Sequence, residues 1–212
     1  MSKCTKQMEQ WGGQFGKEYT DRNVLSLEET ELLYKKNYGI TRTKMNSEFI
    51  GNLDRDLKIL EVGSNTGTQL LYLQEAGWKN LYGIEINAYA VELSKSRTKG
   101  INIIQGSAFD IPFNDGFFDM VFTSGVLIHI APEDIDRVLD QMYRCTRQYI
   151  WCFEYYAENY NKVNYRGHAD LLWKTDFAKL FLERFSDLKL VKEKHFKYLY
   201  NENVDTMFLL QK

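Results

Sequence analysis

The stretch that most constrains the fold is residues 57–67, where an apolar run leads into two glycines separated by small polar residues. The run over residues 57–62 predicts a buried strand, and Gly63 and Gly67 predict a tight turn before a helix-compatible segment at residues 70–73. Glycine lets the backbone pass close to a ligand and adopt positive φ, and a helix amino terminus presents free amide donors. The stretch therefore predicts a strand, turn and helix that can hold a cofactor.

Strand-like and helix-like segments alternate along the rest of the chain. Strands are expected near residues 81–85, 101–105, 117–123, 148–155, 188–196 and 206–211. Helices are expected over residues 26–36, 44–52, 68–77, 88–99 and 173–184, and another is expected to begin near Pro132. This alternation indicates an α/β fold with a mostly parallel sheet and helices on both faces. Ligands of such sheets bind outside the carboxyl ends of the strands.

The amino-terminal residues 1–23 follow neither a helical nor a strand period, and we interpret them as an ordered loop. This loop either tethers the terminus to the core or forms a lid in which Trp11, Tyr19 and Arg22 face a ligand. At 212 residues the chain is long enough for one domain with a substantial core. We therefore expect a single domain over residues 1–212, with a lid and helices in 1–52 and a cofactor-binding core in 53–212.

Charge and cysteine usage exclude several classes of function. A net charge of −2 gives no overall basic field for a nucleic-acid backbone. Cys4, Cys145 and Cys152 form neither an even set nor a CxxC pair, which is typical of reduced thiols in a cytoplasmic protein. The three histidines show no metal-ligand spacing. No apolar run approaches the ~20 residues of a membrane span and no signal-peptide pattern is present, so we expect no metal, nucleic-acid or membrane partner.

A carboxylate follows the second predicted strand and indicates the type of cofactor. Glu85 comes about twenty residues after the glycine turn, where dinucleotide-binding folds hold both ribose hydroxyls with an acidic side chain. The NAD fingerprint requires a middle glycine, and Asn65 stands at that position here. The turn therefore favours a nucleoside cofactor other than NAD.

In this order the motifs resemble those of the class I methyltransferases that depend on S-adenosylmethionine (SAM). The resemblance rests on residues 61–67, Glu85, 106–109 and 118–129. It implies a Rossmann-like fold with a mostly parallel seven-stranded sheet and SAM as the cofactor. The implied cofactor-binding residues are Glu61, Gly63, Ser64, Asn65 and Gly67 in the turn, Glu85 and Ile86 at the ribose, Ala108 and Phe109 at the adenine, and Gly125 and Val126 near the sulfonium. Trp11, Tyr19 and Arg22 of the predicted lid complete this set, with Arg22 at the SAM carboxylate.

Outer segments of the chain sharpen the resemblance. Residues 11–23, 125–132, 165–168 and 173–177 resemble the bacterial methylases associated with pseudaminic acid biosynthesis. This second resemblance covers nearly the full length and implies work near surface-sugar biosynthesis. It does not identify the acceptor, because a family alone does not establish a reaction.

Candidate residues for acceptor chemistry follow the fourth and fifth strands. His129 lies on the expected ligand side, and an unperturbed pKa of ~6.5 would suit proton transfer, although a cap on the helix near Pro132 explains it equally well. Arg166 could bind a carboxylate or phosphate through paired hydrogen bonds. The full set of expected acceptor-binding residues is Glu154, Tyr155, Tyr165, Arg166 and His168.

Three functions agree with this pattern. The leading one is a SAM-dependent methyltransferase acting on a small polar acceptor, a sugar or nucleotide-linked sugar of bacterial surface-glycan assembly. The second is methylation of a phosphate-like or amine-bearing metabolite, and the third is a SAM-binding accessory protein without turnover. Transfer of the methyl group from labelled SAM distinguishes the enzymes from the accessory protein. The oligomeric state is left open by the sequence.

Overall fold

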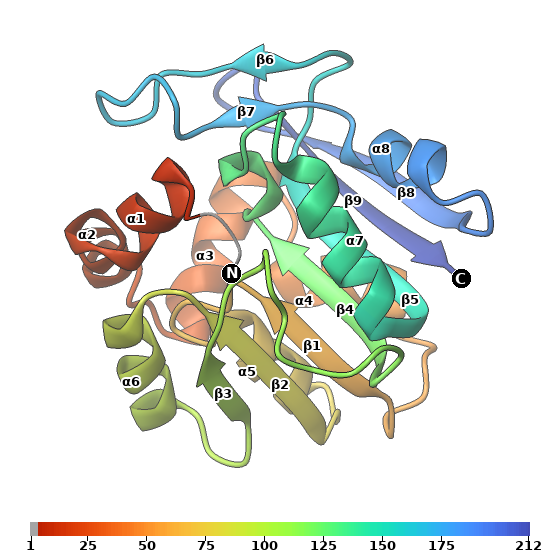
Figure 1. The fold of residues 1–212 in the computed structure, drawn as a ribbon. Helices are drawn as coiled ribbons and strands as arrows, with labels where there is room; N and C mark the ends of the chain where they lie inside the picture. The colour runs from red at the N-terminus through yellow and green to blue at the C-terminus, as the bar shows by residue number, and fades with distance from the viewer. Residues whose placement is uncertain (1–3) are drawn as a thin grey trace.

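A seven-stranded sheet organises the molecule, which the computed structural model describes over residues 4–212. The strand order is β3-β2-β1-β4-β5-β9-β8 (Figure 1). The strands are β1 (Lys58–Val62), β2 (Asn80–Glu85), β3 (Asn102–Gln105), β4 (Phe118–Ser124), β5 (Thr146–Tyr155), β8 (Lys189–Lys197) and β9 (Val204–Gln211). Strands β1 to β5 pair in parallel, whereas β9 runs antiparallel to both β5 and β8. The predicted mostly parallel, seven-stranded α/β fold is confirmed.

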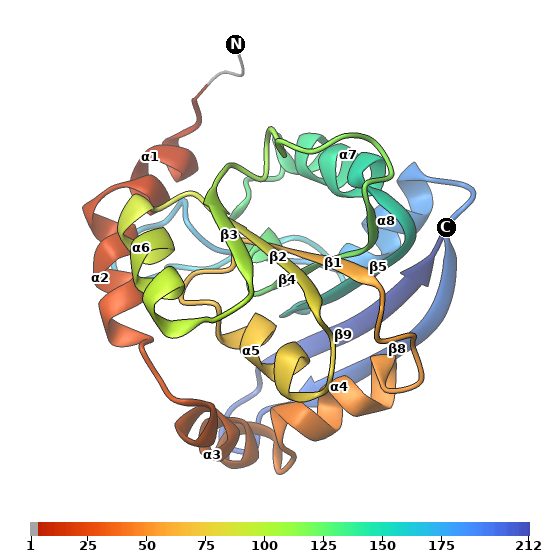
Figure 2. The same cartoon turned by 90° about the horizontal axis from the view of Figure 1, so that it is seen from below.

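Helices cover both faces of this sheet. They are α1 (Lys6–Gly12), α2 (Gln14–Arg22), α3 (Leu27–Tyr38), α4 (Arg42–Ile50), α5 (Thr68–Glu75), α6 (Ala88–Arg97), α7 (Ile135–Cys145) and α8 (Phe177–Arg184), with a short 3₁₀ turn η1 at Leu127–His129. Figure 2 shows α4 and α5 on one side of the sheet and α7 and α8 on the other. Successive residues of a strand point to opposite faces, so Ile59 packs on the α4 and α5 side and Leu60 on the α7 and α8 side. The parallel strands are therefore buried on both faces, as a doubly covered sheet requires.

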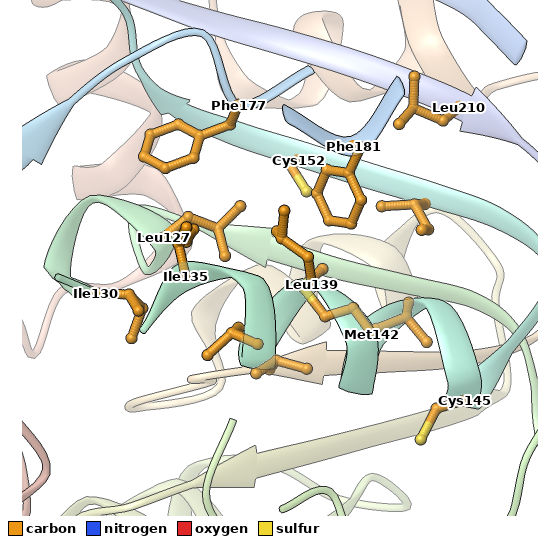
Figure 3. Packing of buried hydrophobic residues seen from close by; sticks show 14 of the residues in the cluster. Leu127, Ile130, Ile135, Leu139, Met142, Cys145, Cys152, Phe177, Phe181 and Leu210 are labelled. Carbon is orange, nitrogen blue, oxygen red and sulfur yellow. The ribbon is translucent and has the colours of Figure 1, made fainter. Parts of the chain in front are cut away.

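The core on the α7 side fixes the ends of β4 and β5. Leu139 and Met142 of α7 meet Phe181 of α8 above the sheet (Figure 3). Ile135, Val138, Leu139 and Met142 are buried and recur at helical spacing, which gives α7 its apolar stripe. This packing holds rigid the strand ends from which the site is built.

The amino-terminal prediction was wrong in its secondary structure. Residues 6–22 form the two short helices α1 and α2, not a loop, and the first three residues of the predicted loop lie outside the described chain. Thr5 caps α1 by accepting the Met8 amide at 3.2 Å. Helices of seven and nine residues are too short to display a clear apolar stripe, and Gly13 breaks the pattern between them.

A second correction concerns residues 173–184, where one helix was expected. Trp173–Lys174 forms strand β7, which pairs with β6 (Asn161–Lys162) in a separate small hairpin. The helix α8 begins at Phe177 because Asp176 accepts the Lys179 amide at 2.9 Å and caps it. Similarly, α7 begins at Ile135, beyond the expected start near Pro132.

Candidate functional site

Two joined cavities lie at the carboxyl ends of the central strands. The first has a volume of about 290 Å³ and is lined by the turn after β1, the end of β2, the segment after β3 and parts of α1 to α3. The second has a volume of about 240 Å³ and lies toward β5 and β9. Both cavities are lined by Tyr19, Leu33, Tyr34, Ser124, Gly125 and His129. We call the first the cofactor cavity, the second the acceptor cavity, and these six shared residues the neck.

The turn after β1 is built around glycine. Gly63 has a φ of +73°, and a Cβ there would lie 2.7 Å from Cγ2 of Val126. The amides of Gly63 and Ser64 donate to the Ile84 carbonyl at 2.8 and 3.0 Å, which ties the turn to β2. Asn65 also has a positive φ, of 43°, which asparagine tolerates better than most residues. The result is a backbone loop that approaches the cavity without side chains in the way.

Glu85 connects this turn to the start of α6. Its carboxylate accepts hydrogen bonds from the Asn65 amide at 2.9 Å and the Asn87 amide at 2.8 Å. Glu85 is only 8% exposed. Burial raises the pKa of Glu85, while the backbone donors of Asn87 and Asn65 lower it. The Ile86 backbone donor also lowers the pKa of Glu85, and a carboxylate with about four lone-pair sites still keeps capacity for a further donor. Glu85 is therefore placed to hold hydroxyl groups in the cofactor cavity.

Several buried polar atoms beside the turn have no hydrogen-bond partner within residues 4–212. They are Oε2 of Glu61, Oγ of Ser64 and Oδ1 of Asn65, and all three residues line the cofactor cavity. Burial raises the pKa of Glu61 well above its usual value, while the charge of the fully buried Arg42 lowers it. Buried polar atoms are normally paired, so these acceptors fit a ligand that brings its own donors. An ammonium group and hydroxyls, as SAM carries, meet that requirement.

The helices α1 and α2 cover the cofactor cavity. The Nδ2 of Asn87 donates to the carbonyls of Trp11 and Gly13, each at 3.0 Å, and so fixes the helix pair to the turn before α6. The Trp11 ring lies 5.2 Å from the Tyr19 ring and 4.4 Å from the His129 ring, measured between centroids. Trp11 and Tyr19 line the cavity, whereas Arg22 is exposed and lines neither cavity. The expected lid position is thus seen for the two aromatics and not for Arg22.

The acceptor cavity has an aromatic and acidic lining. Its rings are Tyr19, Tyr34, Tyr38, Phe153, Tyr155, Tyr165 and Tyr198, and its carboxylates are Glu154 and Asp205. Among residues 4–212, no lysine or arginine lines it. Burial raises the pKa of Glu154 to about 7 and that of Asp205 to about 6. Glu154 also accepts the Val126 amide at 3.1 Å and so shapes the neck.

His129 lies at the neck in a buried, neutral state. Its Nδ1 is 2.5 Å from the Leu171 carbonyl, which fixes the tautomer with the proton on Nδ1 and leaves Nε2 as an acceptor. Burial lowers the pKa of His129 to about 4, against the value near 6.5 that the sequence suggested. The residue belongs to η1 and does not cap α7, whose N-cap is Asp134. The capping alternative is therefore excluded.

The other residues predicted from the sequence divide into two groups. Within the described chain, the cofactor cavity is lined by Glu61, Gly63, Ser64, Asn65, Glu85, Ile86, Ala108, Phe109, Gly125 and Val126, and the acceptor cavity by Glu154, Tyr155 and Tyr165. Gly67 lies behind the turn, where its φ of +76° starts α5. Arg166 is exposed, with its guanidinium 5.9 Å from the Tyr165 ring centroid, and the His168 ring packs 5.2 Å from Phe15. Neither Arg166 nor His168 lines a cavity.

The sequence did not point to much of the acceptor cavity. Tyr34 and Tyr38 of α3 both line it, as do Tyr198 and Asp205 near the β8–β9 connection. A pair of tyrosines four residues apart on a predicted helix is the signal that could have identified the first two. Asp205 carries no such signal, because it reaches the cavity through the antiparallel pairing of β9 with β5, and Tyr198 lies in the connection between β8 and β9.

Two absences concern the described residues alone. Within residues 4–212, no three His, Cys, Asp or Glu side chains gather as metal ligands. Over the same residues, no helix combines the length and apolarity needed to cross a bilayer.

Comparisons with known proteins agree with this geometry. Residues 60–152 match the family described as a methyltransferase domain. The chain is 24% identical over 219 residues to the phosphoethanolamine N-methyltransferase of Plasmodium falciparum, an alignment that covers 91% of this chain and 80% of that one.

Solved structures share the fold at low sequence identity. A SAM-dependent methyltransferase of Thermotoga maritima, described as a possible histamine N-methyltransferase, has a TM-score of 0.63 at 17% identity and covers 93% of this chain and 96% of its own. A SAM-dependent methyltransferase of Methanosarcina mazei has a TM-score of 0.61 at 18% identity, with 76% and 95% covered. These structural likenesses concern the fold.

Proposed function

We propose that this class I SAM-dependent methyltransferase transfers the methyl group of its cofactor to the amino nitrogen of a small polar acceptor. The methyltransferase activity and the SAM cofactor are the premise, supported by the domain match over residues 60–152 and by the full-length methyltransferase relative. The amine is the new element. It is supported by one observation, the lining of the acceptor cavity.

That lining suits a cation or an amine better than an anion. Tyrosine faces attract ammonium groups, and the buried carboxyl groups of Glu154 and Asp205 offer acceptor oxygens and, in their ionised form, negative charge. A phosphate or carboxylate would meet those carboxylates with no lysine or arginine in the described lining to offset them. The lining of the acceptor cavity therefore favours an amine over a phosphate. A phosphate acceptor is one of the alternatives that the sequence left open.

The protonation state of His129 separates amines from hydroxyls. SAM, when bound, supplies a methyl group on a sulfonium, and its transfer to a neutral amine breaks the C–S bond, forms an N–C bond and leaves S-adenosylhomocysteine and a proton. A neutral amine has a free lone pair and needs mainly alignment, whereas a sugar hydroxyl needs a base. An imidazole with a pKa of about 4 is a weak base for a hydroxyl.

We assign the residues as follows. Glu61, Gly63, Ser64, Asn65, Glu85, Ile86, Ala108, Phe109, Gly125 and Val126 would hold the cofactor. Trp11 in the cofactor cavity and Tyr19 at the neck would exclude water from the site. Burial raises the pKa of Tyr19, so its phenol stays protonated. Tyr155 and Tyr165 would contact the acceptor, and Nε2 of His129 would accept a hydrogen bond from its nitrogen. Gly67 would serve the turn without contacting the cofactor.

An amino sugar satisfies two requirements. It carries the amine that the lining of the acceptor cavity favours, and it is a sugar, as the resemblance to the pseudaminic acid-associated methylases implies. We therefore place the reaction in bacterial surface-glycan biosynthesis, on an amine-bearing sugar. A cytoplasmic setting is part of this proposal, and it rests on Cys4, Cys145 and Cys152 being free thiols.

The proposal is tested with methyl-labelled SAM and matched acceptors. The panel contains an amino sugar, the same sugar with a hydroxyl in place of the amine, its phosphorylated form, ethanolamine and phosphoethanolamine. We expect label on nitrogen of the amino sugar or ethanolamine and at least tenfold less on the hydroxyl and phosphorylated partners. If the hydroxyl sugar is labelled at an equal or greater rate, the acceptor atom is the sugar hydroxyl and the proposed amine is wrong.

The role of His129 is tested by replacing it with alanine. We expect turnover to fall roughly a hundredfold while calorimetric SAM affinity changes little, because His129 lies at the neck and its Nε2 is left as an acceptor for the amine. Any inflection of turnover between pH about 6 and about 7 should persist in His129→Ala, since the pKa of His129 is about 4 whereas those of Glu154 and Asp205 are about 7 and about 6. His195→Ala, on β8 outside both cavities, is the control. Equal turnover in the two variants would remove His129 from the reaction.

A further inference from the structure

One face of α3 runs along the acceptor cavity from the neck to its far end. Leu33 and Tyr34 belong to the neck, and Asn37 and Tyr38, one turn later, line the cavity beyond it. The Tyr34 and Tyr38 rings lie 5.6 Å apart between centroids. The amide of Leu199 donates to the Asn37 carbonyl at 2.8 Å, which fixes the β8–β9 connection against α3. The far end of the cavity is thus a rigid junction of α3 with β9.

A buried carboxylate occupies this far end. Asp205 of β9 is only 4% exposed and lines the acceptor cavity. The phenol of Tyr38 donates a hydrogen bond to its Oδ2, and the Tyr198 ring lies 4.7 Å from the Tyr38 ring. The Tyr198 hydroxyl in turn donates to the Tyr155 hydroxyl at 3.3 Å. A carboxylate has about four lone-pair sites, so Asp205 keeps acceptor capacity for a ligand.

The cations nearest to Asp205 stand outside the cavity. Lys174 of β7 donates from Nζ to Oδ1 of Asn203 at 2.5 Å and lies 4.8 Å from the Tyr155 ring centroid. Arg42 is fully buried and donates to the Tyr34 hydroxyl at 2.8 Å and to Oγ of Ser124 at 3.3 Å. Their charges act on Asp205, but neither residue lines the acceptor cavity. A ligand group at the far end would therefore meet the carboxylate and two phenols.

We propose that Tyr38, Tyr198 and Asp205 form a second polar subsite that binds a hydrogen-bond-donating group of the acceptor, a hydroxyl or an ammonium, and rejects a phosphate or carboxylate. This proposal rests on the proposed function, which places the reacting amine at the neck. Tyr34 of the neck and Tyr38 of the subsite lie one turn apart on α3, with ring centroids 5.6 Å apart. The acceptor that fits both ends therefore carries a donor several bonds away from its reacting nitrogen, as opposite positions of an amino sugar ring do.

The subsite is tested by binding, with the wild-type protein saturated with S-adenosylhomocysteine. The probes are aminobutanol, butylamine and aminobutyl phosphate, which differ only in the group four carbons from the nitrogen. We expect aminobutanol to bind roughly tenfold tighter than butylamine in ligand-detected NMR titrations, and aminobutyl phosphate to bind weakest. Equal affinity of aminobutanol and butylamine would contradict the subsite.

Variants assign the preference to Asp205. Asp205→Asn removes the charge and keeps one acceptor oxygen, so it should reduce the affinity advantage of aminobutanol over butylamine and the discrimination against aminobutyl phosphate. Tyr198→Phe keeps the charge of Asp205 and should retain the discrimination against the phosphate. Asp187→Asn is the matched control, since Asp187 also accepts a tyrosine hydroxyl, from Tyr143 at 2.7 Å, but lines neither cavity. An undiminished preference for aminobutanol in folded Asp205→Asn would overturn the assignment. Asp205-dependent binding without methyl transfer to any amine would support the subsite and refute the proposed N-methylation.

Discussion

Replacing Glu85 with alanine is expected to weaken SAM binding by roughly a hundredfold or more, the largest effect that we anticipate for a single cofactor residue. Without the carboxylate, the ribose hydroxyls of SAM would lose two hydrogen bonds. Hydrogen bonds to charged groups contribute about 1.5–3 kcal/mol each. The change also leaves the amides of Asn65 and Asn87 without their acceptor, so the turn itself loosens. Isothermal titration calorimetry with SAM measures the loss.

Two further variants control this prediction. Glu85→Gln keeps an acceptor oxygen and removes the charge, so its affinity should lie between those of the wild type and Glu85→Ala. Glu75→Ala changes an exposed glutamate at the end of α5 and should bind SAM as the wild type does. If Glu85→Ala binds SAM as tightly as Glu75→Ala, the ribose role of Glu85 is wrong.

Replacing Gly16 with alanine should disable the cover formed by α1 and α2. A Cβ at Gly16 would lie 1.8 Å from the Trp11 carbonyl oxygen and 2.7 Å from the Trp11 carbonyl carbon, so the two helices must move apart. Trp11 in the cofactor cavity and Tyr19 at the neck would shift with them. A misplacement of about 1 Å can reduce a rate roughly a hundredfold, so we expect turnover to fall by that order together with weaker SAM binding.

Gly12→Ala provides the matched control for this change. It lies in the same helix pair, and its Cβ would meet nothing closer than Cγ1 of Ile86 at 3.7 Å, an ordinary contact. Steady-state turnover and circular dichroism on both variants separate a moved cover from a lost fold. Equal turnover of Gly16→Ala and Gly12→Ala would show that the tight contact of α1 with α2 does not matter for the reaction.

The parts of the fold that sequence reasoning predicted correctly carry local signals. The strand before Gly63 follows an apolar run, and the helices expected over residues 26–36 and 88–99 begin at the caps Ser26 and Asn87. The apolar stripe of α7 is likewise a pattern within one helix. The helices α1 and α2 were not predicted, because short helices are stabilised by tertiary packing more than by their own sequence pattern. Their anchor is the side chain of Asn87, distant in the sequence.

The acceptor cavity was harder to predict for the same physical reason. It forms where α3, the neck after β4 and strand β9 meet, and no local pattern reports that meeting. The charge of Arg166 made it a candidate for binding an anionic acceptor. Charge alone does not bring a side chain into a cavity, and Arg166 is exposed. Asp205 lies inside because its pairing with Tyr155 across β5 and β9 places it there.

The most direct test of the account is a crystal structure of the wild-type protein with S-adenosylhomocysteine and aminobutanol. We expect the adenine near Phe109, the ribose at Glu85 and the sulfur at the neck between Gly125 and His129. The amine should face that sulfur, with the hydroxyl toward Asp205. A sulfur that points away from the neck, or an amine bound outside the acceptor cavity, would contradict the proposed N-methylation.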